Sequence, residues 1–232
     1  MKAVPINKTA LGKLIGASIF IGLFAMPSAQ LQAHDIDKVG ILKTNFRSND
    51  NRVLLYWKGE VRKSMVKKFK RAINKWKKRA QGGFVISLNS RGGLVRDGYK
   101  VINIIRRLKK THYITTYVAR GNTCGSMCVP IFLTGNSRIA AGASIWLFHD
   151  IAGRDKNDKS RRILKPWKTD KMFRNYYIPA GVSKPWIDDI KIKIKGSDYW
   201  MTGKEVYSSH ANIITRLSSN RRARKLRTMA RR

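Results

Sequence analysis

The apolar residues of this chain alternate between short continuous runs and longer stretches in which they recur every three or four positions. The runs have the β-branched and aromatic composition of strands and cover residues 52–57, 84–88, 113–119, 138–141, 144–148 and 212–215. The helical spacing covers residues 61–79, 95–108, 126–134, 161–177 and 183–195. This alternation predicts an α/β fold of layered elements with parallel strand pairs.

Three details of the pattern depend on local residue types. Proline is tolerated only in the first turn of a helix, so Pro130 implies that the short apolar helix begins near Ser126. The polar segment Ile151–Lys159 predicts a loop. Asp198 is expected to open a late helical unit that extends to Tyr207.

The first 33 residues have the pattern of a secretory signal peptide. Three lysines and no acid precede an apolar run at residues 14–26, and small residues follow it. We expect cleavage after Ala33, with Ala29 as the second choice. The mature protein would then be periplasmic or secreted, in a compartment where disulfides persist. An uncleaved segment would instead anchor the protein in the inner membrane.

The charge of the chain is strongly unbalanced, with 49 Lys and Arg against 13 Asp and Glu and a net charge of +36. At 43% apolar residues the chain is too hydrophobic for a disordered polycation, so we expect one domain over residues 34–217 and a disordered basic tail at 218–232. The helix at 61–79 and the tail would attract anionic polymers or a membrane surface. No motif that reads bases accompanies the charge, so specific nucleic-acid recognition is not expected.

Composition excludes several other classes of protein. No run of 18 apolar residues occurs, which excludes a multi-span membrane protein. Two cysteines exclude a disulfide-rich scaffold, and no two histidines share the spacing of metal ligands. We therefore expect neither a metal nor a cofactor.

Three polar residues stand out by their positions: Ser126 in a glycine-bounded turn between strand and helix, His149 at the end of a strand, and Asp198 before a late unit. A serine hydroxyl attacks well only when a base takes its proton and a third group orients that base. A helix starting at Ser126 would add free N–H groups, and the Gly92-Gly93 turn would add another donor. Each residue also has a structural interpretation, because serine and aspartate commonly cap helices and a lone histidine is usually structural.

Five segments, in order, resemble the proteolytic subunit ClpP of the ClpP/crotonase superfamily. They are RVLLYWKGEV, ISLNSRGGLVRDGYKVINIIRRL, GNTCGSMCVPIFLTGNSRIA, SIWLFHD and SDYWMTGKEVYSSHANIIT, which together span residues 52–215. Arg91 replaces the proline that this family usually has before its glycine pair. The Cys-x-Ser-x-Cys pattern looks most like that of exported bacterial ClpP-like proteins.

The resemblance implies a ClpP/crotonase-like fold of repeated ββα units and a serine peptidase acting on peptides or proteins. It implies Ser126 as nucleophile, His149 as base and Asp198 as the orienting acid. The backbone N–H groups of Gly93 and Met127 would form the oxyanion hole beside Gly92. The family's cytosolic members form ring stacks fed by an ATPase, so a homo-oligomer is one expectation. Export to a compartment without ATP and the many lysines of the first helix argue against barrel assembly and processive proteolysis.

Cys124 and Cys128 lie four residues apart across the candidate nucleophile. A disulfide between them is sterically allowed if the turn brings their Cα atoms to within about 4.4–6.8 Å. Such a bond would stiffen the serine turn. The alternative is a pair of small buried thiols.

Three other functions compete with the serine peptidase. The first is a non-catalytic ClpP-like module that binds envelope partners or anionic polymers through its cationic surface. The second is crotonase-type acyl-CoA chemistry, which needs the two oxyanion donors but no nucleophilic serine. The third is a Ser–Lys dyad in which Lys165 or another lysine acts as the base.

Overall fold

The computed structural model of the protein describes residues 40–158 and 160–218. The predicted signal peptide therefore lies outside the described residues, and so does the basic run that begins at Arg221. Within the described residues, no helix is both long and apolar enough to cross a membrane.

A six-stranded sheet forms the larger layer of the molecule. Its strands, in spatial order, are β1 (Ile41–Arg47), β2 (Arg52–Lys58), β3 (Gly83–Asn89), β4 (Ile114–Val118), β6 (Ser137–Ala140) and β11 (Arg216–Leu217). All neighbouring strands are parallel except β1 and β2, which form an antiparallel hairpin. The expected α/β organisation with parallel pairs is therefore present.

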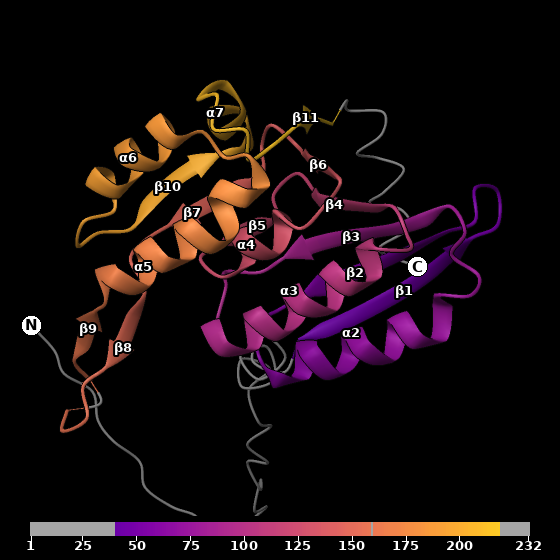
Figure 1. Ribbon diagram of the computed structural model, residues 1–232, viewed down its shortest axis with the longest axis horizontal. Coiled ribbons are helices and arrows are strands. Elements are labelled where there is room, and N and C mark those ends of the chain that lie inside the picture. The colour runs from indigo at the N-terminus through magenta and orange to yellow at the C-terminus, as the bar shows by residue number, and fades with distance from the viewer. Residues whose placement is uncertain (1–39, 159, 219–232) are drawn as a thin grey trace, which may run out of the picture.

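A second, smaller sheet packs beside the first (Figure 1). It contains β10 (Tyr199–Thr202), β7 (Ile145–Phe148) and β5 (Thr123–Gly125), with β7 in the middle. Strand β7 is parallel to β5 and antiparallel to β10. Because β5 follows β4 and β7 follows β6, the chain passes repeatedly from the large sheet to the small one.

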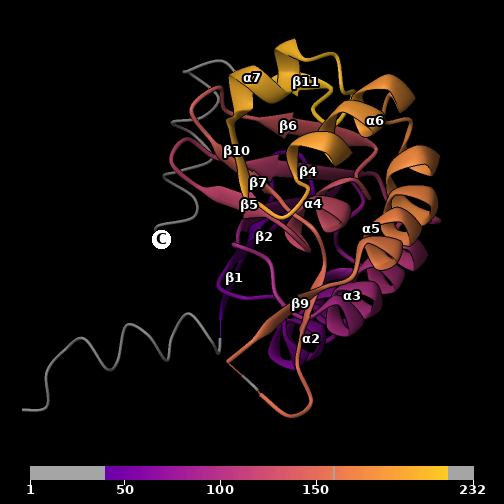
Figure 2. The same cartoon turned by 90° about the vertical axis from the view of Figure 1, so that its left-hand side faces the viewer.

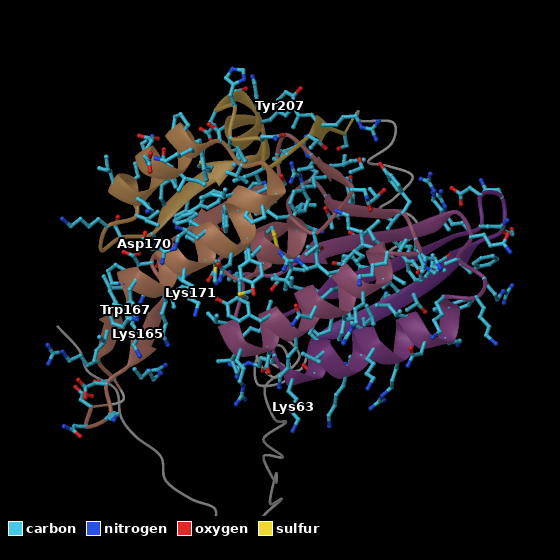
Figure 3. All side chains as sticks on the ribbon, viewed as in Figure 1. Lys63, Lys165, Trp167, Asp170, Lys171 and Tyr207 are labelled. Carbon is cyan, nitrogen blue, oxygen red and sulfur yellow. A yellow bond between two sulfur atoms is a disulfide. The ribbon has the colours of Figure 1, made fainter. Side chains whose placement is uncertain are left out.

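Most of the helices lie along one side of the molecule, as Figure 2 shows for α2, α3, α5 and α6. The helices are α2 (Lys63–Trp76), α3 (Val95–Lys109), α4 (Cys128–Phe132), α5 (Pro166–Met172), α6 (Lys184–Lys193) and α7 (Gly203–Ser208). A π-helical turn, Phe173–Tyr177, and a 3-10 turn, Ile178–Ala180, continue α5. An ion pair of 2.6 Å between Asp170 and Lys191 links α5 to α6, and Asp170 is labelled in Figure 3.

The periodicity of α2 explains how the main core forms. Met65, Phe69 and Ile73 recur at helical spacing and are buried against the sheet. Alternate residues of β2, including Leu55 and Trp57, meet them in one large cluster. A smaller cluster, which includes Leu54, forms on the opposite face of the sheet. The central strands therefore have buried side chains on both faces, as is typical of parallel sheets.

The structure differs from the sequence-based expectations mainly after β7. Part of the predicted loop at 151–159 is strand β8 (Ala152–Arg154), which pairs with β9 (Arg162–Leu164) in an antiparallel hairpin. The polar residues belong to its tip, where the carboxylate of Asp155 accepts a hydrogen bond from the N–H of Asn157. The helix predicted from residue 161 begins only at Pro166, because proline favours the first helical position.

Three other boundaries were also misplaced. Asp198 precedes strand β10, and the helical turn of that unit starts only at Gly203. The helix expected from Ser126 begins at Cys128 and has five residues. The last strand lies at Arg216–Leu217 rather than at 212–215. Strand β1 was not anticipated, because it is an edge strand whose residues are mostly exposed or half-buried and so lack an apolar run.

Candidate active site

The small sheet brings Ser126, His149 and Asp198 to one edge. Ser126 follows the last residue of β5, and His149 follows the last residue of β7, which runs parallel to it. Asp198 directly precedes β10, which is antiparallel to β7 with Tyr199 opposite Phe148. Asp198 therefore stands opposite His149, one step beyond the last strand pair. Three residues that are far apart in the sequence follow the order serine, histidine, aspartate across adjacent strands.

Ser126 has a strained backbone conformation. Its φ angle is +49°, in the left-handed region that residues other than glycine rarely occupy. Its N–H donates to the carbonyl of Leu147 at 2.8 Å, and its own carbonyl accepts from Val129 at 3.0 Å. These bonds fix the turn, which connects β5 to α4, against the neighbouring strand β7. Such strain costs on the order of 1–3 kcal/mol and is concentrated at functional sites.

A disulfide between Cys124 and Cys128 encloses the serine turn, with Cα atoms 5.2 Å apart. Both cysteines are buried, one in β5 and the other at the first residue of α4. The bond therefore ties the strand before Ser126 to the helix after it. Because α4 is so short, its dipole contributes less than a helix starting at Ser126 would have done.

Two backbone donors are available beside Ser126. The N–H of Val61 donates to Gly92 and the N–H of Leu94 donates to Val61, so the Gly93 peptide between them points its own N–H to the opposite side. Within residues 40–158 and 160–218, neither this N–H nor that of Met127 has a hydrogen-bond acceptor. Free backbone donors beside a nucleophilic serine are what an oxyanion hole requires.

Gly92 leaves the space between these donors open. Its φ angle is +107°, and a methyl group built on it would lie 2.6 Å from Ser126 Cβ and 3.0 Å from the nitrogen of Met127. Any side chain at this position would therefore collide with the serine turn and cover a candidate oxyanion donor. Glycine is required here for both conformation and space.

The ring of His149 is half-buried and makes two contacts at Nδ1. The carbonyl oxygen of Asp150 lies 2.7 Å away, and Nη2 of Arg162, in strand β9, lies 3.2 Å away. Nη1 of the same guanidinium is 3.9 Å from Oδ1 of Asp198. Arg162 therefore contacts both the imidazole and the carboxylate that sequence reasoning placed in direct contact with each other. Among the described residues, no hydrogen bond joins Asp198 to His149 or Ser126 Oγ to the imidazole.

Ser126 and His149 line a common cavity of about 20 Å³. This is space for about one water molecule. The rest of its lining is largely apolar and comprises Leu147, Phe148, Ile151, Thr169, Met172, Phe173, Tyr177 and Ile194. Burial raises the pKa of the Tyr177 phenol well above its ordinary value, so this side chain stays protonated at neutral pH.

Lys165, the alternative base, lies elsewhere. Its ammonium is next to Gly153 of the β8–β9 hairpin, at whose base Figure 3 labels it, and it is not among the residues that line the Ser126 cavity. Across the described ranges, no group of three or more His, Cys, Asp or Glu residues is placed to hold a metal ion.

Sequence reasoning missed two groups at this site, the Arg162 guanidinium and the Asp150 carbonyl. A backbone carbonyl has no sequence signature, and one arginine among 49 basic residues carries little information. The one available signal was the apolar pair Ile163-Leu164 after a polar stretch, which is consistent with the second strand of a hairpin.

No family model and no curated protein matches the sequence. Solved structures do match. ClpP1 from Listeria monocytogenes has a TM-score of 0.56 at 17% identity, over 75% of this chain and 94% of that one. The ClpP catalytic domain from Plasmodium falciparum has a TM-score of 0.52 at 15% identity, over 74% and 87% of the two chains. A mutant of a membrane-bound stomatin-specific protease, in complex with a substrate peptide, has a TM-score of 0.55 at 17% identity, over 71% and 73%. The predicted fold class is therefore confirmed.

Proposed function

Because the chain has the ClpP fold, we propose that it is a serine-type peptidase or related acyl hydrolase that acts outside the cytosol. The observation that carries the proposal is the surroundings of Ser126. Its backbone is in the left-handed region, two unpaired backbone N–H groups lie beside it, and it lines one cavity with His149. A serine that only capped a helix would need neither the left-handed conformation nor the free N–H of Gly93.

The geometry supports acyl transfer in the following order. Ser126 Oγ attacks the carbonyl carbon of a peptide or ester and gives its proton to Nε2 of His149. The oxyanion accepts hydrogen bonds from the N–H groups of Gly93 and Met127. His149 then protonates the leaving group, and a water molecule hydrolyses the acyl-enzyme by the reverse sequence of proton transfers. Asp198, opposite His149 on β10, is the candidate group to stabilise the imidazolium.

The cavity suggests the substrate class. Its lining is mostly aliphatic and aromatic, with the protonated Tyr177 as the largest polar side chain. An apolar side chain beside the scissile bond of a peptide or protein fits these walls, once the cavity widens beyond the volume of one water molecule. We also propose that the protein assembles as a homo-oligomer, to be checked by sedimentation velocity, where a single monomeric species would exclude it.

Export is part of the proposal and rests on the basic, apolar and small-residue segments of residues 1–33. It can be tested together with the chemistry. The protein is expressed with its full N-terminus in a Gram-negative bacterium, recovered from the periplasm, and treated with a fluorophosphonate probe. We expect the intact mass of a chain that begins at His34, and we expect the probe to label Ser126.

In this experiment, Ser126→Ala should abolish labelling while the exposed Ser208→Ala control retains it. If the Ser126→Ala protein were labelled as strongly as the wild type, the assignment of Ser126 as the nucleophile would be disproved. Recovery only from the cytosol, with residues 1–33 intact, would disprove export without bearing on the chemistry.

One observation favours the non-catalytic alternative. The outer face of α2 and the turn after it carry eight exposed basic residues, which are Lys63, Lys67, Lys70, Arg71, Lys75, Lys77, Lys78 and Arg79. Lys63 projects away from the sheet at the start of the helix (Figure 3). A module that binds anionic polymers would use this face, and it would give no acyl-enzyme under any condition.

A further inference from the structure

The two contacts at Nδ1 of His149 require opposite protonation states of that atom. The Asp150 carbonyl can only accept a hydrogen bond, so it needs a proton on Nδ1. The Arg162 guanidinium can only donate, so it needs a bare Nδ1. A neutral imidazole can satisfy one of these partners but not both. The partner that prevails decides which tautomer His149 adopts.

The tautomer decides whether His149 can act as a base. With the proton on Nδ1, Nε2 is free to take the proton of Ser126. With Nδ1 accepting from Arg162, the proton sits on Nε2, and the ring cannot receive another there. A charge-assisted hydrogen bond is roughly twice as strong as a neutral one. The guanidinium therefore favours the second state, even though its 3.2 Å contact is longer than the 2.7 Å contact with the Asp150 carbonyl.

Arg162 also opposes the later step. The imidazole becomes positively charged when it takes the serine proton, and a guanidinium at 3.2 Å repels that charge. The same guanidinium attracts Asp198. The carboxylate that stands opposite His149 is therefore directed toward a cation instead of toward the ring.

We propose that Arg162 is an inhibitory positioning residue, which holds His149 in the Nε2–H tautomer and keeps Asp198 from the imidazole until the β8–β9 hairpin carries it away. This inference rests on the proposed acyl-transfer function of Ser126 and His149. In the released state the Asp150 carbonyl holds the proton on Nδ1, and Arg162 no longer draws the Asp198 carboxylate away from the ring.

The hairpin is suited to this movement. Its two strands have three residues each, pair only with one another, and form a sheet separate from the other two. It projects from the body of the molecule in Figure 1. A hydrogen bond of 2.7 Å from the N–H of Lys165 to the Ile151 carbonyl closes its base. An isolated two-stranded hairpin is only marginally stable, so displacing it costs little.

The cavity is consistent with a resting state. Ile151 and Thr169 belong to its wall, and the hydroxyl of Thr169 accepts a hydrogen bond of 2.8 Å from the N–H of Ile151. Ile151 directly precedes the hairpin. Moving the hairpin would therefore shift a wall of the cavity as well as Arg162, and would open space for a substrate side chain.

The test compares Arg162→Ala with Arg161→Ala, which removes the same charge from the neighbouring exposed position of the hairpin. Nitrogen-15 spectra of ¹⁵N-histidine protein, recorded at about pH 8 where an ordinary imidazole is neutral, distinguish the two tautomers. We expect His149 to be Nε2–H in the wild type and in Arg161→Ala, and Nδ1–H in Arg162→Ala. Fluorophosphonate labelling should be at least about tenfold faster in Arg162→Ala, within the roughly 10²–10⁴-fold contribution of a general base.

The outcomes separate the two proposals. An unchanged His149 tautomer in Arg162→Ala overturns the inhibitory role, whatever the labelling rate. A changed tautomer with faster, Ser126-dependent labelling supports both proposals. A changed tautomer with no labelling of any variant supports the control of the His149 tautomer by Arg162 and disproves the peptidase function.

Discussion

At the residue scale, the site depends on backbone conformations that most side chains would not allow. The backbone of Ser126 is in the left-handed region, and Gly92 lies so close to Ser126 that it leaves no room for a side chain of its own. The glycine pair and the serine turn could be picked out in the sequence because glycine marks close backbone approach. The contact of Arg162 with both His149 and Asp198 could not, because it depends on where a surface hairpin places its side chains relative to the sheet edge.

Gly92→Ala should remove activity by blocking the space between the oxyanion donors. The added methyl would lie 3.0 Å from the nitrogen of Met127, and losing one such donor slows acyl transfer by about 10²–10³-fold. The measurement is the rate of fluorophosphonate labelling, together with a urea unfolding curve.

Gly121→Ala is the matched control for this prediction. Gly121 also has a positive φ, +71°, but nothing lies within 4 Å of an added methyl. Both substitutions should destabilise the fold through backbone strain, and only Gly92→Ala should abolish labelling. Equal labelling of the two variants would show that the space beside Met127 is not needed.

At the scale of elements, apolar periodicity located most helices and strands, and failed where local hydrogen bonding decides the outcome. Helices α2 and α3 were found because their buried residues recur every three or four positions. The β8–β9 hairpin was missed because its strands are short and all their residues are exposed or half-buried. The unit after Asp198 was assigned to a helix throughout because its strand has only four residues, the last of which, Thr202, already caps α7.

The capping box of α7 gives a prediction with a defined pH dependence. Thr202 accepts from the N–H of Glu205, and the Glu205 carboxylate accepts from the N–H and hydroxyl of Thr202, which lowers the pKa of Glu205 below its ordinary value of 4.5. A lowered carboxyl pKa means stability that is present above the ordinary value and is lost as the pH falls through the folded value. Glu205→Gln should therefore flatten the acid side of the stability curve.

Thr202→Ala tests the other half of the same box. Removing an N-cap side chain typically costs about 1 kcal/mol, whereas Thr202→Ser keeps the acceptor and should cost much less. Urea unfolding between pH 3 and pH 7 measures both effects. A Glu205→Gln protein with the same pH profile as the wild type would argue that the carboxylate contacts contribute nothing to folding.

At the scale of the whole molecule, the net charge of +36 and the ClpP fold point to different activities for different faces. The catalytic candidates lie at one edge of the small sheet, while the exposed cations of α2 lie on a helix that covers the large sheet. Composition could predict that the surface is cationic but not where the charge gathers, because that depends on which face of α2 packs against the core.

The roles of the two faces can be distinguished by the salt dependence with which the protein binds an anionic polymer. Replacing Lys67, Lys70, Lys75 and Lys78 by Gln should weaken binding to duplex DNA of any sequence, used here as a generic anionic polymer. The slope of log K against log salt should fall by about one unit or less for each lysine removed. Labelling at Ser126 should be unchanged in this variant, and an unchanged slope would mean that the cations of α2 do not contact the polymer.

The central position of β7 limits how the sheet edge that carries the candidate residues can be distorted. Its residues pair with β5 on one side and with β10 on the other, so a slide by one residue would turn His149 to the opposite face and break both ladders together. A change of register is therefore not available to this sheet without the loss of both ladders. Graded adjustment of catalytic rate, whether by evolution or by an engineer, has to act through peripheral segments that touch the edge without belonging to its ladders.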